Sequence, residues 1–248
     1  MFMKRLATIG TIAVFIGIVV VVNKFEPRRV AEQRLNQEED VSELIQEIEE
    51  LEEQQTALLA GDPESAEIFS VQFDCSNGTF VVECYPEWSP LGAAQFKVAV
   101  KAGVYNEARF FRVLPDYIVQ FGISGNPEVA NEWEIKTILD EPVKQPNERG
   151  TITFAKSSAP NSRTCHVFIN LVDNSRGLDS LGFSPFGKVI SGMDVVEGIN
   201  GEYAERPVQD MILTRGNAYL KENFPNLGYI IRATVLSAEE SEDAEQAQ

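Results

Sequence analysis

The stretch RFFRVLPDYIVQFG, residues 109–122, is strongly apolar and yet contains an arginine and a glutamine, Arg112 and Gln120. Burial of an isolated charge in a protein core is unfavourable, and no carboxylate lies within three residues of Arg112 to pair with it locally. We therefore expect Arg112 to face water, a partner or a substrate. Because alternate residues of a strand point to the same side, Arg112, Ile118 and Gln120 are predicted to share one face despite the turn at Pro115.

Upstream of this stretch, two strand-like runs, EIFSVQFDC and TFVVECY, flank Asn77-Gly78. This dipeptide is a strong signal for a β-hairpin turn. If these two residues form the turn, Cys84 pairs with Val71, and Cys75 lies about 13 Å from Cys84, which is too far for a disulfide. All three cysteines are therefore predicted to be free and buried.

The remaining segments are mostly strand-like, with few helices. WSPLGAAQFKVAVKAGVY predicts a helix with Ser89 as N-cap, Pro90 in the first turn and Gly103 at its end. A polar loop with Pro142 and Pro146 follows residues 109–122, and RGTITFAK, CHVFINLV, PFGKVI and GYIIRATVL read as strands. SGMDVVEGI predicts a short helix, and GNAYLKENFPNL predicts a helix or turn. This pattern favours an antiparallel barrel or sandwich with helices at its ends.

The N-terminal part of the chain, residues 1–29, has a different character. Leu6 to Val22 is a run of seventeen residues without a charge, near the short end of what spans a hydrocarbon core of about 30 Å. We expect an uncleaved membrane anchor, because no small-x-small cleavage site follows the run; a cleaved signal peptide is the alternative. The expected topology is a single pass with the large domain outside the cytoplasm, periplasmic or lumenal.

Residues 30–66 predict an acidic helical stalk. Apolar residues fall on heptad positions at Val41, Leu44, Ile48, Leu51 and Leu58. Two interpretations stay open: a spacer between membrane and domain, and a coiled coil that supports weak homo-oligomers. The net charge of −17 and the acidic tail, residues 238–248, argue against a nucleic-acid partner, because such a chain repels phosphate. The tail is expected to be disordered.

Four segments of the chain resemble the signatures of the cyclophilin family. FFRVLPDYIVQFG resembles the pattern Phe-x-Arg-x-(Ile/Val/Leu)-Pro-x-(Phe/Tyr)-x-x-Gln-x-Gly. RGTITFAKSSAPNSRTCHVFIN, LDSLGFSPFGKVISGMDVVEGI and WSPLGAAQFKVAVKAGVYN resemble the second and third signatures and the first helix of the family. The resemblance covers residues 67–237 and implies a mainly β fold, a closed antiparallel eight-stranded barrel capped by helices.

Cyclophilins are peptidyl-prolyl cis-trans isomerases, so the resemblance implies proline-containing polypeptides as substrates. Amide resonance sets a barrier near 20 kcal/mol to rotation about an X-Pro bond. A guanidinium that donates a hydrogen bond to the prolyl nitrogen weakens this resonance, and neither a metal nor another cofactor is required. The resemblance implies that Arg112 is the catalytic cation and that Gln120 holds the substrate backbone. The alternative for this pair is a surface ion pair.

The resemblance also implies a substrate-binding surface with a pocket for the proline ring and a rim along the adjoining peptide. The pocket residues are Tyr117, Ile118, Phe168 and Leu178. The rim residues are Ala155 and, through its main chain, Lys156. For the apolar members the alternative is ordinary barrel core.

Two departures from the family pattern concern this surface. His166 stands where the second signature usually has glutamine, and it shares strand parity with Phe168. It is either a hydrogen-bonding group on the substrate side or a spectator at the barrel rim. NSRG precedes Leu178 where many family members have a tryptophan, so the pocket rim and the binding of the family's cyclic peptide inhibitor are open.

The expected function is that of a membrane-tethered prolyl isomerase that assists the folding of exported or envelope proteins. One alternative is a proline-peptide-binding chaperone or scaffold module with weak catalysis. Another gives the function to the stalk as an assembly element. The presence of Arg112, Gln120 and Phe168 favours the isomerase over the binding module, and the interrupted heptads count against the stalk as an assembly element.

Overall fold

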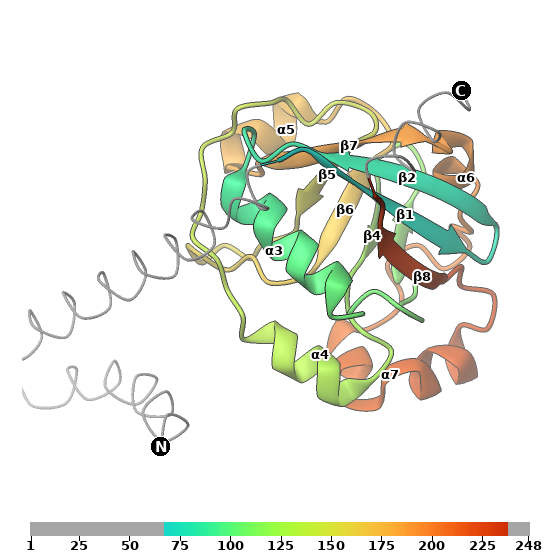
Figure 1. Ribbon diagram of the computed structural model, residues 1–248. Coiled ribbons are helices and arrows are strands. Elements are labelled where there is room, and N and C mark those ends of the chain that lie inside the picture. Colours follow the sequence, from blue (N-terminus) through green and yellow to red (C-terminus); the bar gives the residue numbers. More distant parts are fainter. Residues whose placement is uncertain (1–66, 238–248) are drawn as a thin grey trace, which may run out of the picture. The chain divides into compact units, whose positions relative to one another are not determined.

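The computed structural model describes residues 67–237 (Figure 1). The expected anchor (1–29), stalk (30–66) and tail (238–248) lie outside the described residues. Between residues 67 and 237, none of the helices combines the length and the apolar character that a membrane crossing needs. Membrane attachment therefore stays a prediction.

Eight strands form one antiparallel sheet, in the order β3-β4-β6-β5-β7-β2-β1-β8. The first four strands in the chain are β1 (Phe69–Cys75), β2 (Gly78–Cys84), β3 (Arg112–Leu114) and β4 (Ile118–Phe121). The other four are β5 (Thr151–Phe154), β6 (Val167–Asn170), β7 (Pro185–Ser191) and β8 (Ile230–Val235). The predicted mainly β, antiparallel fold is confirmed.

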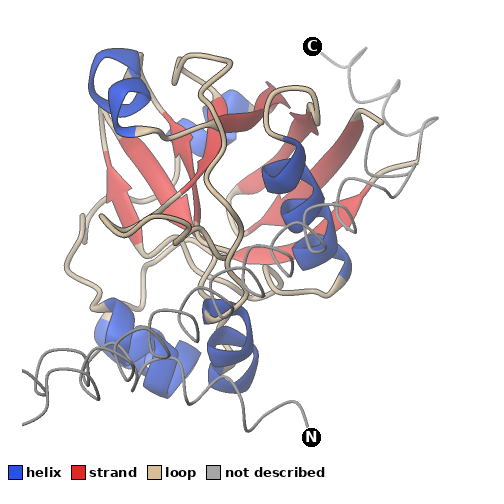
Figure 2. Ribbon diagram, turned by 90° about the vertical axis from the view of Figure 1, so that its left-hand side faces the viewer, coloured by secondary structure: helices blue, strands red, loops and turns tan. Residues whose placement is uncertain are grey.

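The sheet curls, so that its β2–β1–β8 half faces its β5–β6–β4 half (Figures 1 and 2). Within residues 67–237, no ladder joins the two edge strands, β3 and β8. Their flanking segments meet instead, through an isolated bridge between Arg109 and Tyr229 and a 3.0 Å hydrogen bond from the Phe110 N–H to the Gly228 carbonyl. The described chain is thus a curved half-barrel, and the continuous closure that we expected is not seen.

The main core fills the inside of this curled sheet. Phe73 stacks on Phe80 with ring centroids 4.8 Å apart and meets Phe121 edge-on at 5.6 Å. Helix α3 (Pro90–Lys101) adds Phe96, which packs against Phe186 of β7 at 4.8 Å. All five rings are fully buried, and each buried ring of this size stabilises a fold by about 1.5–3 kcal/mol.

The turn of the β1–β2 hairpin lies one residue earlier than predicted. Ser76 and Asn77 form the turn, and Gly78 already pairs with Cys75 as part of β2. The prediction of an Asn77-Gly78 turn was therefore wrong. A tertiary contact explains the difference, because the Asn77 amide donates a 2.8 Å hydrogen bond to the carbonyl of Val195 in α6 (Met193–Glu197).

The corrected register pairs Cys84 with Phe69 instead of Val71, two residues from the expected position. A shift of two residues leaves every side chain on its original face, so the burial pattern is unchanged. Cys75, Cys84 and Cys165 are free and buried, as predicted. Burial raises the pKa of Cys75 and of Cys165 to about 12, so these groups stay protonated thiols.

Two helices, α4 (Pro127–Glu134) and α7 (Gln209–Asn223), pack side by side at one end of the curled sheet (Figure 1). Helix α7 begins before the segment for which we predicted a helix or turn. Helix α4 lies in the polar segment after residues 109–122, for which the sequence composition predicts a loop. Its start signals are present nevertheless: Asn126 caps the helix by accepting the Glu128 N–H at 2.9 Å, and a proline follows.

A second apolar cluster lies between these two helices and the sheet. Its buried members are Phe111, Ile123, Ala130, Tyr203, Ile212, Tyr219, Leu220 and Leu227. Helix α7 kinks at Gly216, which has a φ of 55°, and a Cβ there would lie 2.1 Å from the Gly125 carbonyl oxygen. Only glycine allows this approach, which lets the Asn217 N–H donate to the same carbonyl at 2.9 Å.

Candidate active site

Three of the predicted site residues lie in one row across the sheet, on the face opposite the main core. Arg112 in β3 pairs with Gln120 in β4, and Gln120 pairs with Phe168 in β6. The Arg112 Nη1 group donates a 3.4 Å hydrogen bond to Gln120 Oε1. The predicted common orientation of Arg112 and Gln120 is confirmed, and it follows from the two-residue period of the strands.

A small apolar cluster, separate from the main core, adjoins this row. It consists of buried Ile118, Phe168 and Leu178, with half-buried Tyr117, Ala155 and Phe183 packed against them. Five of these six residues were predicted for the substrate surface. Phe183, whose ring meets that of Phe168 edge-on at 5.8 Å, was missed. Its place in the sequence, just before PFGKVI, carried no signal beyond that of a core residue.

The cluster continues into an open hollow of about 360 Å³. Tyr117 and Leu178 belong to the cluster and also line the hollow. Asn174, Arg176 and Gly177 are among its other walls. A Cβ at Gly177 would meet no atom within 4 Å, so this wall is open. The NSRG segment therefore leaves space at the rim of the apolar cluster. Leu178 itself ends the short helix α5 (Ser175–Leu178), which continues into the 3₁₀ turn Asp179–Leu181.

Arg112 has a carboxylate partner that the local sequence did not indicate. Its Nε lies 3.1 Å from Oε2 of Glu205, and its guanidinium lies 6.0 Å from the centre of the Tyr117 ring. The two charged side chains are 27% and 66% exposed, so water screens this pair. Arg112 therefore faces both water and a carboxylate that lies 93 residues away in the sequence.

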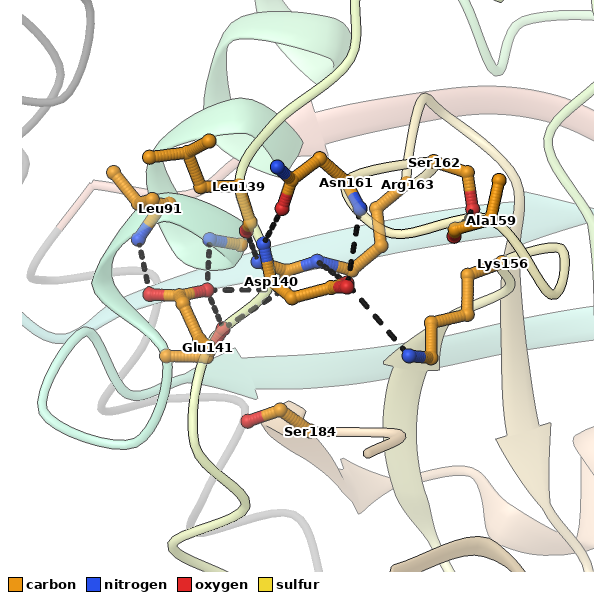
Figure 3. A network of polar contacts seen from close by, with 12 residues as sticks. Leu91, Leu139, Asp140, Glu141, Lys156, Ala159, Asn161, Ser162, Arg163 and Ser184 are labelled. Carbon is orange, nitrogen blue, oxygen red and sulfur yellow. Dashed lines mark hydrogen bonds and ion pairs between the residues drawn. The ribbon is translucent and has the colours of Figure 1, made fainter. Parts of the chain in front are cut away.

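The rim residues Ala155 and Lys156 follow strand β5. The Ala155 N–H donates a 2.8 Å hydrogen bond to the His166 carbonyl. The Lys156 ammonium lies 3.8 Å from the Asp140 carboxylate and 5.8 Å from the centre of the Phe183 ring. Lys156 thus connects the apolar cluster to a network of polar contacts on the neighbouring loops (Figure 3).

The centre of this network is Arg163, which is 1% exposed (Figure 3). Its Nη1 lies 2.9 Å from Glu141, and its Nη2 donates to the Leu139 carbonyl. The same Glu141 carboxylate accepts the N–H groups of Leu91 at 2.8 Å and Gly92 at 3.0 Å. It therefore caps helix α3, where Ser89 was expected to accept the backbone N–H groups; the Ser89 hydroxyl donates to Glu141 instead.

The network also holds the loop that follows Lys156. The Asp140 N–H donates to Asn161 Oδ1 at 2.8 Å, and the Asn161 N–H donates to Asp140 Oδ2 at 3.0 Å. Asn161 has a φ of 55°, a conformation that asparagine adopts more readily than most residues. This reciprocal pair joins the loop to the segment that carries Glu141.

His166 lies at the junction between the sheet and helix α4. Its Nε2 is 3.0 Å from the Glu134 carboxylate, and its ring meets Phe111 at 6.1 Å between centroids. Both partners belong to the end of the molecule that carries α4 and α7. The part of His166 in substrate binding stays a prediction. Over residues 67–237, no group of three or more His, Cys, Asp or Glu side chains is arranged to hold a metal ion.

Comparisons with known proteins agree with this arrangement. Residues 69–217 match the family model described as "Cyclophilin type peptidyl-prolyl cis-trans isomerase/CLD". The chain is 30% identical over 158 residues to peptidyl-prolyl cis-trans isomerase B of Escherichia coli, covering 58% of this chain and 95% of that protein. It is 35% identical over 134 residues to a peptidyl-prolyl cis-trans isomerase of Acinetobacter baylyi, covering 52% of this chain and 70% of that protein.

The fold is similar to that of a cyclophilin type peptidyl-prolyl cis-trans isomerase of Cryptosporidium parvum. The TM-score is 0.52 at 17% sequence identity, and the match covers 69% of this chain and 99% of that chain. A second structure of that protein, in the presence of the dipeptide Ala-Pro, gives a TM-score of 0.51. At this level of identity, the likeness concerns the fold.

Proposed function

Since this chain belongs to the cyclophilin-type peptidyl-prolyl cis-trans isomerase family and is a prolyl isomerase, we propose that Arg112 and Gln120 act on the X-Pro bond of its polypeptide substrates. One observation carries the assignment. The two side chains are direct cross-strand neighbours and adjoin an apolar cluster that is separate from the main core. A charged donor beside an apolar pocket is the arrangement that this reaction requires.

The reaction requires only that the prolyl nitrogen lose its conjugation with the carbonyl group. As the bond twists, the nitrogen becomes pyramidal and accepts a hydrogen bond from the Arg112 guanidinium. An acceleration from about 0.01 to about 1000 per second corresponds to a barrier lower by roughly 7 kcal/mol. Gln120 Oε1 accepts from Arg112 at 3.4 Å, which leaves its amide N–H groups to bind the substrate backbone.

The apolar cluster would hold the proline ring. Its buried members are Ile118, Phe168 and Leu178, and the half-buried rings of Tyr117 and Phe183 pack against them. The ring then lies within reach of the guanidinium in the same row.

The rim would bind the peptide next to the proline. The last backbone hydrogen bond of this ladder is that from Ala155 to His166, so the main chain at Lys156 is placed to pair with an extended substrate. His166 lies next to this point and would act as a further substrate-side group.

The cellular role extends the proposal to the residues outside the structure. Residues 1–29 would anchor the protein in a membrane, residues 30–66 would form the spacer, with weak homo-oligomers through the stalk, and residues 67–237 would act outside the cytoplasm on exported proteins. The support is the uncharged run from Leu6 to Val22. A carbonate wash tests the anchor: the full-length protein is expected to stay with the membranes, and a soluble form that begins after Val22 would contradict it.

The assignment of Arg112 is tested by an isomerisation assay on the full-length protein in detergent. Arg112→Ala is compared with wild type and with Arg215→Ala, which removes a different exposed arginine, 2.8 Å from Glu222. We expect a large loss for Arg112→Ala alone. Equal activity in all three proteins would refute the catalytic assignment, and intact peptide binding without turnover in wild type would favour a binding module.

A further inference from the structure

The segment that carries Glu205, the carboxylate partner of Arg112, is joined to strand β3 through the backbone. The Val113 N–H, next to Arg112, donates a 3.1 Å hydrogen bond to the carbonyl of Ala204, next to Glu205. The Ala204 N–H in turn donates to the Gly201 carbonyl at 3.0 Å, which closes a tight turn. Strand β3 and the segment that carries Glu205 are therefore joined within one residue of the ion pair.

The same segment is also anchored in the cluster between α4, α7 and the sheet. Tyr203 is 7% exposed, and its ring meets Phe224 edge-on at 5.2 Å. Arg206 donates from Nη2 to the Glu202 carbonyl at 3.1 Å and lies 5.0 Å over the Tyr203 ring. Glu205 lies between these two anchored residues. Its Cα is thereby fixed, although its carboxylate is exposed.

The contact restricts the orientation of the guanidinium. A guanidinium carries five N–H groups in one rigid plane. The Nε–H of Arg112 donates to Glu205 at 3.1 Å and Nη1 donates to Gln120 at 3.4 Å, so two different nitrogen atoms are held by two different elements. Among the described residues, no partner accepts from Nη2, which leaves its N–H groups for a substrate.

We propose that Glu205 is a positioning residue of the isomerase: it holds the Arg112 plane in the orientation in which Nη2 donates to the prolyl nitrogen. The inference rests on the proposed catalytic role of Arg112. An arginine side chain has many rotamers, and a partly exposed one samples them unless its contacts select one. Glu205 acts through Arg112 and does not itself touch the substrate.

The test is a double-mutant cycle on the full-length protein, with kcat and KM measured separately on an X-Pro peptide. Glu205→Ala is expected to lower kcat about three- to tenfold with a smaller change in KM. Glu205→Gln should keep at least half of the wild-type kcat, because its amide oxygen still accepts from Nε. In an Arg112→Ala background, Glu205→Ala should have no further effect.

Glu222→Ala is the matched control, since Glu222 forms an exposed ion pair of the same kind with Arg215 and is 63% exposed. It should leave kcat unchanged. If Arg112→Ala is impaired but Glu205→Ala behaves like this control, the inference fails and the proposed function stands. An equal loss in both backgrounds, or a faster enzyme, would also overturn the inference. A fully active Arg112→Ala would instead refute the catalytic assignment itself.

Discussion

Arg163 and Arg112 both contact glutamates, and the two arginines differ in how much of the side chain is open to solvent. The side chain of Arg163 is 2% exposed, and its Nη1 and Nη2 groups donate to Glu141 and the Leu139 carbonyl. The side chain of Arg112 is 27% exposed and keeps N–H groups available. A guanidinium whose donors are used inside the protein stabilises the fold, whereas one with open donors can act on a bound peptide.

The largest effect, a loss of folding stability, is expected for Arg163, the buried arginine. Arg163→Ala leaves the Glu141 carboxylate, 7% exposed, without its cation, and the loss of one partner of a buried pair costs about 3–5 kcal/mol. We expect urea unfolding to show a loss of this size. Arg215→Ala, which breaks an exposed pair, should cost less than about 1 kcal/mol. Similar losses for both variants would contradict the distinction between the two arginines.

Arg112→Ala should lower the activity strongly and the stability only slightly. We expect kcat/KM to fall about tenfold to a hundredfold, which corresponds to roughly 1.4–2.7 kcal/mol of transition-state stabilisation. The free energy of unfolding should change by less than about 1 kcal/mol, because the pair with Glu205 is exposed. Isomerisation kinetics and urea unfolding on the same preparations measure both quantities. A variant that loses stability in proportion to activity would make Arg112 a structural residue.

The Asp140 carboxylate links the polar network around Arg163 to the rim of the candidate site. It accepts the Asn161 N–H and lies 3.9 Å from Arg163 and 3.8 Å from Lys156. Asp140→Ala should free the loop after Lys156 and cost about 1 kcal/mol of stability. We expect KM to rise about two- to fivefold with kcat nearly unchanged, because the loop borders the rim and not the proposed catalytic pair, Arg112 and Gln120. A fall in kcat at constant KM would show that the network positions Arg112 as well.

The smallest effect is expected at His166. His166→Gln removes the contact with Glu134, 3.0 Å away, but restores the residue type that the family resemblance implies at this position. At neutral pH we expect at least half of the wild-type kcat/KM to remain. Isomerisation assays at neutral pH compare the two proteins. An unchanged kcat/KM would make His166 a spectator, and a loss above tenfold would make it part of the catalytic machinery.

Strand periodicity predicts that Arg112, Ile118 and Gln120 share one face, and the observed register agrees. The family resemblance predicted Phe168 for the same site, and Phe168 pairs with Gln120. Glu205 and Phe183 could not be found in this way. They reach the site through long-range contacts, and an isolated glutamate or phenylalanine in a loop carries no local signal for such a contact.

The fold shows the same division between local and long-range information. The hairpin was recognised, but its turn was misplaced because a contact between Asn77 and Val195 outweighs the preference of the Asn-Gly dipeptide. The start of α4 was marked by Asn126 and Pro127, and these signals were overlooked in a segment rich in loop residues. The contact between the segments that flank the two edge strands depends on backbone pairing between residues about 120 apart in the sequence, which no local pattern encodes.

The three buried thiols have a consequence for the redox chemistry of the domain. Oxidants attack the thiolate of an accessible cysteine, and Cys75, Cys84 and Cys165 are only 6%, 0% and 1% exposed, with each pKa raised by burial. The folded domain therefore presents almost no reactive thiol to hydrogen peroxide or to a disulfide-forming enzyme. It can keep reduced cysteines in an oxidising compartment without the help of a reductant, and only unfolding exposes them to mispairing.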